Sequence, residues 1–365
     1  MVPIIIANPK PFRLVLRDES DHWMPNLDEV NSKNYDYIKL HRATVFFDAD
    51  LKCKLPVCIG FDGSFILPAS KDYSMIETAL DDFNRIFASI FIGGLYVTSI
   101  APKDLSHGVM HNEGYFRHTH TLGSRGDLYK ALGNRDAGAL DNIKLLNPPK
   151  VYRGEFTQAY SKGAVVFNKV NNLSPSLFIS AFTYYLELQT REALTNSWIC
   201  IEQILEHLWQ EVMLPDVKAV NIQGRSKFMN SQQWTASHKI ELLYQSEILT
   251  AETYSKLTDA RLSRNKFIHI GKAPSHENAC NALYALIELI SACAEQGGFE
   301  FDKNVLIEYI KPKDKVPHSG FKVATAKEVD WTKVTHWKPV LPIPGDKHWE
   351  GEFEIFADIT LESLP

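Results

Sequence analysis

Five stretches in the second half of the chain have the apolar spacing of α-helices, and they constrain the fold more than any other feature. They cover residues 174–190, 191–213, 235–246, 250–270 and 275–296. Ser174 and Pro175 provide a helix start, and Gly271 followed by Pro274 provides a helix end. The connections are short except the one after the second stretch. We therefore predict an antiparallel helical bundle.

The first part of the chain has a different pattern. Apolar, β-branched and aromatic runs predict strands, and one amphipathic run predicts a helix at 74–91. Residues 103–126 are rich in His and Gly without a clear period, which predicts a loop, and Pro and Gly at 146–165 predict a domain boundary. The expected strands are 12–18, 43–50, 56–61 and 94–102.

These patterns predict an α+β protein with three parts. Residues 1–170 form a mixed α/β domain with a sensor or regulatory role, and residues 171–298 form the all-α bundle. Residues 299–365 form a C-terminal extension that packs on the N-terminal domain. It begins with a short helix near 301–313, and 351–361 resembles a last strand.

Composition excludes several classes. The 365 residues are 45% apolar and 23% charged, which is typical of soluble globular proteins. The net charge of −5 means that any nucleic-acid contact requires a local basic patch. Five cysteines without zinc-type pairing indicate a reduced, cytoplasmic protein. The N-terminus lacks signal-peptide features and no apolar run spans a membrane, so we expect no membrane partner.

The candidate site lies in "RLSRNKFIHIG", Arg261 to Gly271, at the end of the fourth helical stretch. It places Arg264, Asn265 and His269 within six residues. The Arg-to-His spacing carries little information, since Arg17 and His22 share it. Basic residues are also common in the last helical turn, where they cap carbonyl groups. Position in the bundle and local charge are what favour a site.

Helix geometry indicates that one chain does not complete this site. Asn265 and His269 share a face, whereas Arg264 is about 140° from His269 around the helix. Two such helices, antiparallel across a two-fold axis, would bring both pairs into one cleft. Residues 254–273 contain five cations and one acid, a net of +4 in an acidic chain. A dimer cleft of this kind suits a phosphodiester.

The segment from about 174 to 296 resembles a HEPN domain, the higher eukaryote and prokaryote nucleotide-binding helical bundle, and is most similar to its ApeA-type branch. "RNKFIH" matches the family motif of Arg, a polar residue, three further residues and His near the end of a late helix. "SWICIEQILEHLW" places Glu202 where the family often has an acid in the earlier long helix. The resemblance covers about a third of the chain.

The resemblance implies an endoribonuclease that needs no metal and no cofactor, acting as a homodimer. Arg264 and His269 would be catalytic with Asn265 in support, and Lys266 and Lys272 would bind RNA phosphates. Glu202 and Arg261 would be supporting residues, with Glu202 orienting Arg264 or Arg261, although Glu202 could also simply pair with a basic residue. Family members serve as toxins or abortive-infection effectors in prokaryotic defence. Others are inactive and bind nucleotides, RNA or partner proteins, which is the alternative function. A regulatory protein or ligand would act through the N-terminal domain.

Three weaker patterns leave alternatives open. His118 and His120 would share one face of a strand, and with Glu113 they could bind zinc, although a polar surface loop or an RNA-facing insertion also fits "SHGVMHNEGYFRHTHT". "GSRGDLYK" at 123–130 is similar to a phosphate-binding turn but lacks the further Gly or Lys. The tryptophans of the C-terminal part suit base stacking or core packing.

Overall fold

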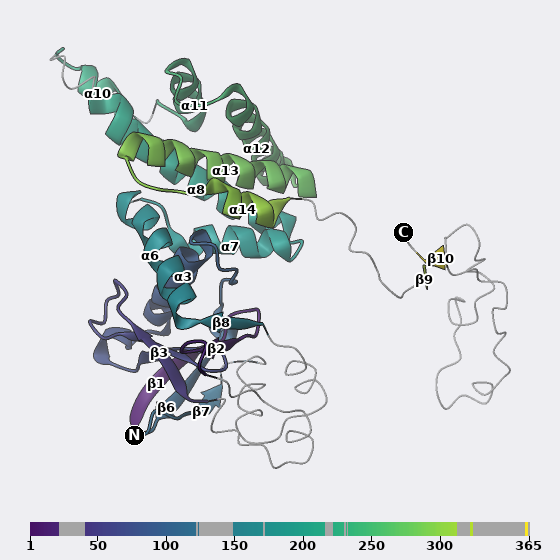
Figure 1. The fold of residues 1–365 in the computed structure, drawn as a ribbon. Coiled ribbons are helices and arrows are strands. Elements are labelled where there is room, and N and C mark those ends of the chain that lie inside the picture. The colour runs from purple at the N-terminus through teal and green to yellow at the C-terminus, as the bar shows by residue number, and fades with distance from the viewer. Residues whose placement is uncertain are drawn as a thin grey trace. The chain divides into compact units, whose positions relative to one another are not determined.

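The computed structural model divides the chain into two compact units, Met1–Ile310 and Lys311–Pro365. In the first unit a sheet is followed by helices, which confirms the α+β class (Figure 1). In the second, β9 (Lys322–Val323) pairs antiparallel with β10 (Glu362–Ser363). The described residues are 1–21, 41–121, 123, 149–170, 172–215, 222–229, 231, 233–311, 322–323 and 362–363.

Six antiparallel strands form the main sheet of the first unit, in the order β3-β4-β5-β1-β6-β7. A separate parallel pair joins β2 (Leu14–Leu16) to β8 (Lys150–Tyr152). Three of the predicted strands are confirmed, as β2, β3 and β4. The strands of the main sheet are β1 (Val2–Ala7), β3 (Ala43–Phe47), β4 (Val57–Gly60), β5 (Phe65–Pro68), β6 (Leu105–Met110) and β7 (Phe116–Thr121).

The main sheet is buried on both faces because it curls on itself. Ile5 and Ala7 of β1 face the helices, whereas Ile4 and Ile6 face a second apolar cluster enclosed by the sheet. The two edge strands, β3 and β7, also meet at one end. There an isolated antiparallel bridge joins Arg42 to Tyr115. The sheet therefore has an interior as well as a helix-covered face.

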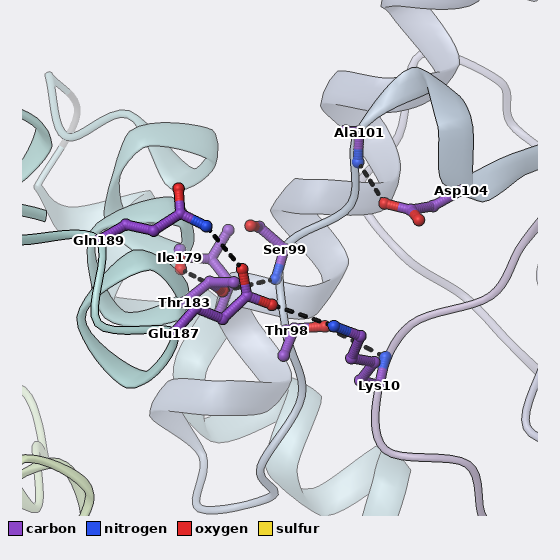
Figure 2. A network of polar contacts seen from close by, with 9 residues as sticks. All are labelled: Lys10, Thr98, Ser99, Ala101, Asp104, Ile179, Thr183, Glu187 and Gln189. Carbon is purple, nitrogen blue, oxygen red and sulfur yellow. Dashed lines mark hydrogen bonds and ion pairs between the residues drawn. The ribbon is translucent and has the colours of Figure 1, made fainter. Parts of the chain in front are cut away.

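Two predictions in this part are wrong. Residues 94–102 do not form a strand, because side chains and turns take up the backbone groups that a neighbouring strand would bind. The N–H of Ser99 donates to Thr183 Oγ1, that of Ile100 to Asn84 Oδ1 and that of Ala101 to Asp104 Oδ2. Figure 2 shows the first and third of these bonds.

Residues 103–126 were expected to form a loop, but they contain the hairpin of β6 and β7. The strands of this hairpin do not show the alternation of apolar and polar residues that is typical of a half-buried strand. Its inward positions include Ser106, Gly108 and His118, which are small or polar, while Arg117 and Thr119 face outward. A sheet interior with a polar end cannot be recognised by hydrophobic period alone.

Two helices connect the sheet to the rest of the unit. The predicted helix α3 (Ile76–Ile92) is confirmed, and α6 (Arg153–Lys169) occupies much of the predicted boundary at 146–165. Phe65 of β5 makes edge contacts with Phe87 of α3 and Phe156 of α6. The glycines that suggested a boundary therefore lie within a helix that covers the sheet.

The five predicted helices of the second half are confirmed. Their starts follow local capping chemistry, since Ser174, Thr250 and Ser275 each accept a hydrogen bond from the backbone N–H three residues later. A five-residue helix, α10 (Arg225–Met229), lies in the longer connection. The helices are α7 (Pro175–Leu186), α8 (Thr190–Leu208), α11 (Ala236–Gln245), α12 (Ala251–Ile270) and α13 (His276–Gly297).

One continuous core joins the sheet part to the helical part. Phe91 of α3 packs against Phe182 of α7 with ring centroids 5.0 Å apart. Polar contacts cross the same junction, where Lys10 Nζ lies 3.1 Å from Glu187 Oε1 (Figure 2). The predicted domains 1–170 and 171–298 thus share their core within one compact unit.

The first unit extends past residue 298, where the C-terminal extension was predicted to begin. The predicted short helix is confirmed as α14 (Lys303–Ile310), and Tyr309 stacks on Phe91 at 4.7 Å. The expected strand at 351–361 and the tryptophans Trp331, Trp337 and Trp349 lie outside the described residues. Within the described ranges, no helix combines the length and apolar character of a membrane span.

Candidate functional site

The candidate site occupies the exposed end of α12. The buried residues of this helix are Thr253, Leu257 and Ala260, all in its first half. The second half exposes apolar side chains instead, with Ile268 at 50% and Ile270 at 72% of full exposure. Apolar groups left in water at a helix end favour contact with another surface.

Arg264 continues the inward stripe of α12. Thr253, Leu257, Ala260 and Arg264 follow one another at steps of four, three and four, which keeps them on one side of a helix. Arg264 is half-buried, and its guanidinium donates a 3.1 Å hydrogen bond to Asn265 Oδ1. An arginine thus stands where the next core residue of the bundle would be.

The cations near the end of α12 are not neutralised. Arg261, Arg264, Lys266 and Lys272 form no ion pair in the described part of the chain. The one acid among residues 254–273 points elsewhere, since Asp259 accepts hydrogen bonds from the amides of Asn278 and Asn281 on α13. The result is a local positive field in an acidic protein.

His269 is exposed and is the last residue but one of α12. Gly271 ends the helix with φ of 69°, a left-handed conformation that glycine adopts without strain, and its N–H donates to Phe267 O. Within one chain, no hydrogen bond or ion pair joins Arg264 to His269 among the described residues. This agrees with their expected angular separation.

The predicted supporting residue Glu202 lies on another helix than the motif. Glu202 of α8 is exposed, and its carboxylate accepts a 2.7 Å hydrogen bond from Trp198 Nε1. In the described part of the chain it forms no ion pair with Arg261 or Arg264. The structure therefore brings Arg264 and Asn265 together and directs Glu202 to a different partner.

The histidines of the β6–β7 hairpin separate into two environments. His118 is buried, whereas His120 is exposed, although the two were expected to share a strand face. A register shift opposite them, between His107 and Gly108, interrupts the alternation of the strand. Only His118 therefore points into the interior of the sheet.

A cavity of about 800 Å³ opens between α3, α6 and the segment that leads into the first turn of α14. Lys162, Glu300 and Asp302 supply its charged lining, and Phe301 and Val305 its apolar part. None of the predicted site residues lines it, so its size does not support the α12 site. Of the predicted turn at 123–130, only Gly123 lies within the described residues.

The exposed Leu262, Ile268 and Ile270 were missed by sequence reasoning, although apolar residues beside a basic motif are a usable signal for an interface. Comparisons with protein-family models, with curated proteins and with solved structures give no match. Function must therefore be argued from the site itself.

Proposed function

We propose that this protein is an endoribonuclease of the HEPN type that cleaves RNA without a metal ion, with its site at the end of α12. In this proposal α7, α8, α11, α12 and α13 form the HEPN-like bundle. The observation that carries it is the second half of α12, where Arg264, Asn265 and His269 stand in the positions that the family motif requires. The cations there form no ion pair with any described residue.

A second copy of the chain completes the proposed site. Two α12 helices packed antiparallel across a two-fold axis would cover Leu262, Ile268 and Ile270, which are exposed in one chain. The same packing would place each His269 near the partner copy's Arg264. The doubled cations would form a cleft for the phosphate backbone, with Lys266 and Lys272 at its edges.

The chemistry requires only these groups. One His269 takes the proton of the 2′-hydroxyl as O2′ attacks phosphorus, and the other gives a proton to the leaving O5′ as the P–O5′ bond breaks. The products are a 2′,3′-cyclic phosphate and a 5′-hydroxyl. The guanidinium of Arg264 offers donors in a fixed fork to the charged phosphorane oxygens, and Asn265 holds that guanidinium.

The remaining assignments follow from position. Arg261 contributes charge, whereas no step is assigned to Glu202, since its carboxylate is bound to Trp198. The sheet part senses a signal or restrains the nuclease. By the family resemblance, the biological role is that of a toxin or abortive-infection effector in prokaryotic defence. Expression of the active chain in bacteria would then arrest growth, and the His269→Ala chain would not.

The test is RNA cleavage by the full chain in the presence of a chelator. His269→Ala and Arg264→Ala should each lower the rate by about 10²-fold or more. His276→Ala is the matched control, because His276 is exposed, lies just past the helix end and stacks on Tyr185. Undiminished cleavage by the His269→Ala chain would rule out the proposed mechanism, and loss of wild-type cleavage on chelation would count against it.

A second candidate function is RNA or nucleotide binding without cleavage. It is favoured by the cations of α12 that have no acidic partner among the described residues, since they can hold phosphate groups without any histidine. Binding in this case would weaken in Arg264→Ala and stay unchanged in His269→Ala, with no product formed. Binding and turnover assays on the same two variants therefore separate the two functions.

A further inference from the structure

Three ionisable side chains from distant parts of the sequence meet inside the curled sheet. His41 precedes β3, Asp62 follows β4 and His118 lies in β7. All three are buried, with exposures of 2%, 1% and 7%. One ligand atom from each lies within 4.8 Å of the others, and they form the one such group found among the described residues.

Closure of the sheet brings these residues together. Ala43 N–H donates to Gly114 O at 2.7 Å, and Phe116 N–H donates to His41 O at 2.9 Å, so β3 and β7 meet at one end. Phe61 N–H donates to Arg42 O on the other side of the same segment. His41 and His118 therefore come from the segments that join at the two edge strands, and Asp62 comes from the turn after the neighbouring strand β4.

The interior of the sheet has an apolar part and a polar part. Ile4, Ile6, Ile66 and Phe116 fill the apolar part. Asn8, Ser64 and Ser106, all buried, lie at the polar part, where Ser64 contacts Asn8 and Asp62 and Ser106 contacts His118. Burying ionisable groups costs free energy unless they are paired or bind a metal.

Two of the three side chains are held by neighbouring groups. Asp62 accepts hydrogen bonds from the N–H of Ser64 at 3.0 Å and from its hydroxyl at 2.8 Å. Ser106 Oγ lies 2.6 Å from His118 Nδ1. Contacts of this kind orient metal-binding carboxylates and imidazoles, because they fix the ring and leave the ligating atom directed inward.

His41 has no such partner. Both of its ring nitrogens are buried without a hydrogen bond among the described residues, although Nδ1 lies 3.2 Å from Asp62 Oδ2. An imidazole N–H in a good hydrogen bond would point at that oxygen, so the two atoms are neighbours that do not face each other. Two ligands of a tetrahedral zinc ion, each about 2.0–2.1 Å from the metal, lie about 3.3 Å apart.

We propose that His41, Asp62 and His118 bind one divalent transition-metal ion, Zn²⁺ in the first instance, at the join of β3 and β7. Imidazole nitrogen with a carboxylate oxygen is a ligand set that suits zinc. Ser106 at Nδ1 makes Nε2 the ligating nitrogen of His118. The widest separation needs to close by no more than about 1.5 Å for all three to reach one ion.

The site has a structural role and is independent of RNA cleavage. The metal would link three segments and so add to the backbone pairing and apolar packing that hold the closed sheet. Because none of its ligands lies in α12, metal loss and loss of cleavage can be measured separately.

Metal content of the full chain, with any histidine tag removed, tests the proposal. After stripping with a chelator and dialysis against Zn²⁺, elemental analysis should give close to one zinc per wild-type chain. Co²⁺, with a water molecule as the fourth ligand, should give the visible absorption bands of a tetrahedral site. Asp62→Asn and His118→Gln should weaken zinc binding by well over about ten-fold. His120→Gln, two residues along and exposed, is the matched control.

Zinc should also raise the unfolding temperature of the wild type and the control, and leave that of Asp62→Asn unchanged. A wild-type chain that keeps no zinc would overturn the proposal and leave a plain buried His41–Asp62 pair. Equal loss of zinc in the control and in His118→Gln would overturn it as well. If the variants at buried positions fail to fold, the zinc content and the Co²⁺ spectrum of the wild-type chain still test whether the site binds a metal ion.

Discussion

The carbonyl oxygen of Ser89 in α3 lies 1.9 Å from the position that a Cβ atom at Gly163 in α6 would occupy. Gly93 meets Ala159 O of α6 at the same distance. These glycines let the two helices touch through their backbones. The contact places α6 against α3 beneath the sheet, which is why the segment forms a helix despite its glycines.

Gly163→Ala should lower the free energy of unfolding by about 2 kcal/mol or more, because backbone atoms cannot move aside as a flexible side chain can. Gly154→Ala in the same helix is the control, since a Cβ there meets nothing within 4 Å. It should be neutral or stabilising by about 0.5 kcal/mol. Urea unfolding followed by circular dichroism measures both, and equal effects would contradict the close contact.

At the junction between the sheet part and the helical part, Thr183 should contribute more to stability than the Lys10–Glu187 ion pair beside it. It is buried, and its hydroxyl accepts from Ser99 N–H at 2.8 Å and donates to Ile179 O at 2.9 Å (Figure 2). Thr183→Val leaves that N–H without its acceptor and should cost about 1–3 kcal/mol. Thr183→Ser keeps the hydroxyl and should cost under about 1 kcal/mol.

The exposed Lys10–Glu187 pair gives the comparison, and Glu187→Gln should change stability by less than about 0.5 kcal/mol. Chemical denaturation of the three variants ranks them. A larger loss from Glu187→Gln than from Thr183→Val would show that the ion pair, and not the buried hydroxyl, holds the junction.

Glu206 should make stability depend on acidic pH. Partial burial raises the pKa of this carboxyl, but hydrogen bonds from Lys239 and Gln210 outweigh it and leave the pKa below the ordinary value of 4.5. Because the folded-state pKa is the lower one, the stabilisation is present above about pH 4.5 and is lost as the pH falls through the folded value.

Glu206→Gln should therefore be less stable than the wild type at neutral pH, and the difference should shrink below about pH 4.5. Unfolding midpoints measured across this range check it. Glu192→Gln on the same helix is the control, since Glu192 is exposed and forms no ion pair among the described residues. A constant difference for Glu206→Gln at all pH values would contradict the argument.

Gly271 should affect the stability of the protein only through its backbone conformation. Its φ is 69°, and a Cβ there would meet nothing within 4 Å. Gly271→Ala should cost about 1 kcal/mol, and Gly271→Asn less, since asparagine tolerates the left-handed region better. Gly298, which ends α13 with φ of 61° in equally open space, should behave in the same way. Chemical denaturation of the Ala and Asn variants at Gly271 and at Gly298 tests whether the two positions behave alike.

Local features of this fold were predictable from the sequence. The caps at Ser174, Thr250 and Ser275 and the left-handed end at Gly271 depend on residues within one helical turn, so these helix ends could be predicted. The C-terminal ends of α7 and α8, at Leu186 and Leu208, lie several residues before the predicted ones. The angle of about 140° between Arg264 and His269 around the helix could also be predicted, because it depends on helix geometry and on no tertiary contact.

Other features were decided only by tertiary structure. Segment 94–102 is not a strand because Asn84 and Thr183, which lie elsewhere in the chain, bind its backbone. Arg264 emerges as the end of a buried stripe only once the bundle stops covering α12 after Ala260. Spacing along the chain cannot show which residues a neighbouring element will cover.

The cluster of polar side chains inside the sheet is the clearest example of a feature that only the tertiary structure decided. The sequence by itself determined the class of fold, the helices with their caps and the residue pattern at the end of α12, since each depends on neighbours in the chain. Only the closed sheet brought His41, Asp62 and His118 together. Contacts between residues so far apart in sequence depend on strand order and register, which form only when the whole core is buried.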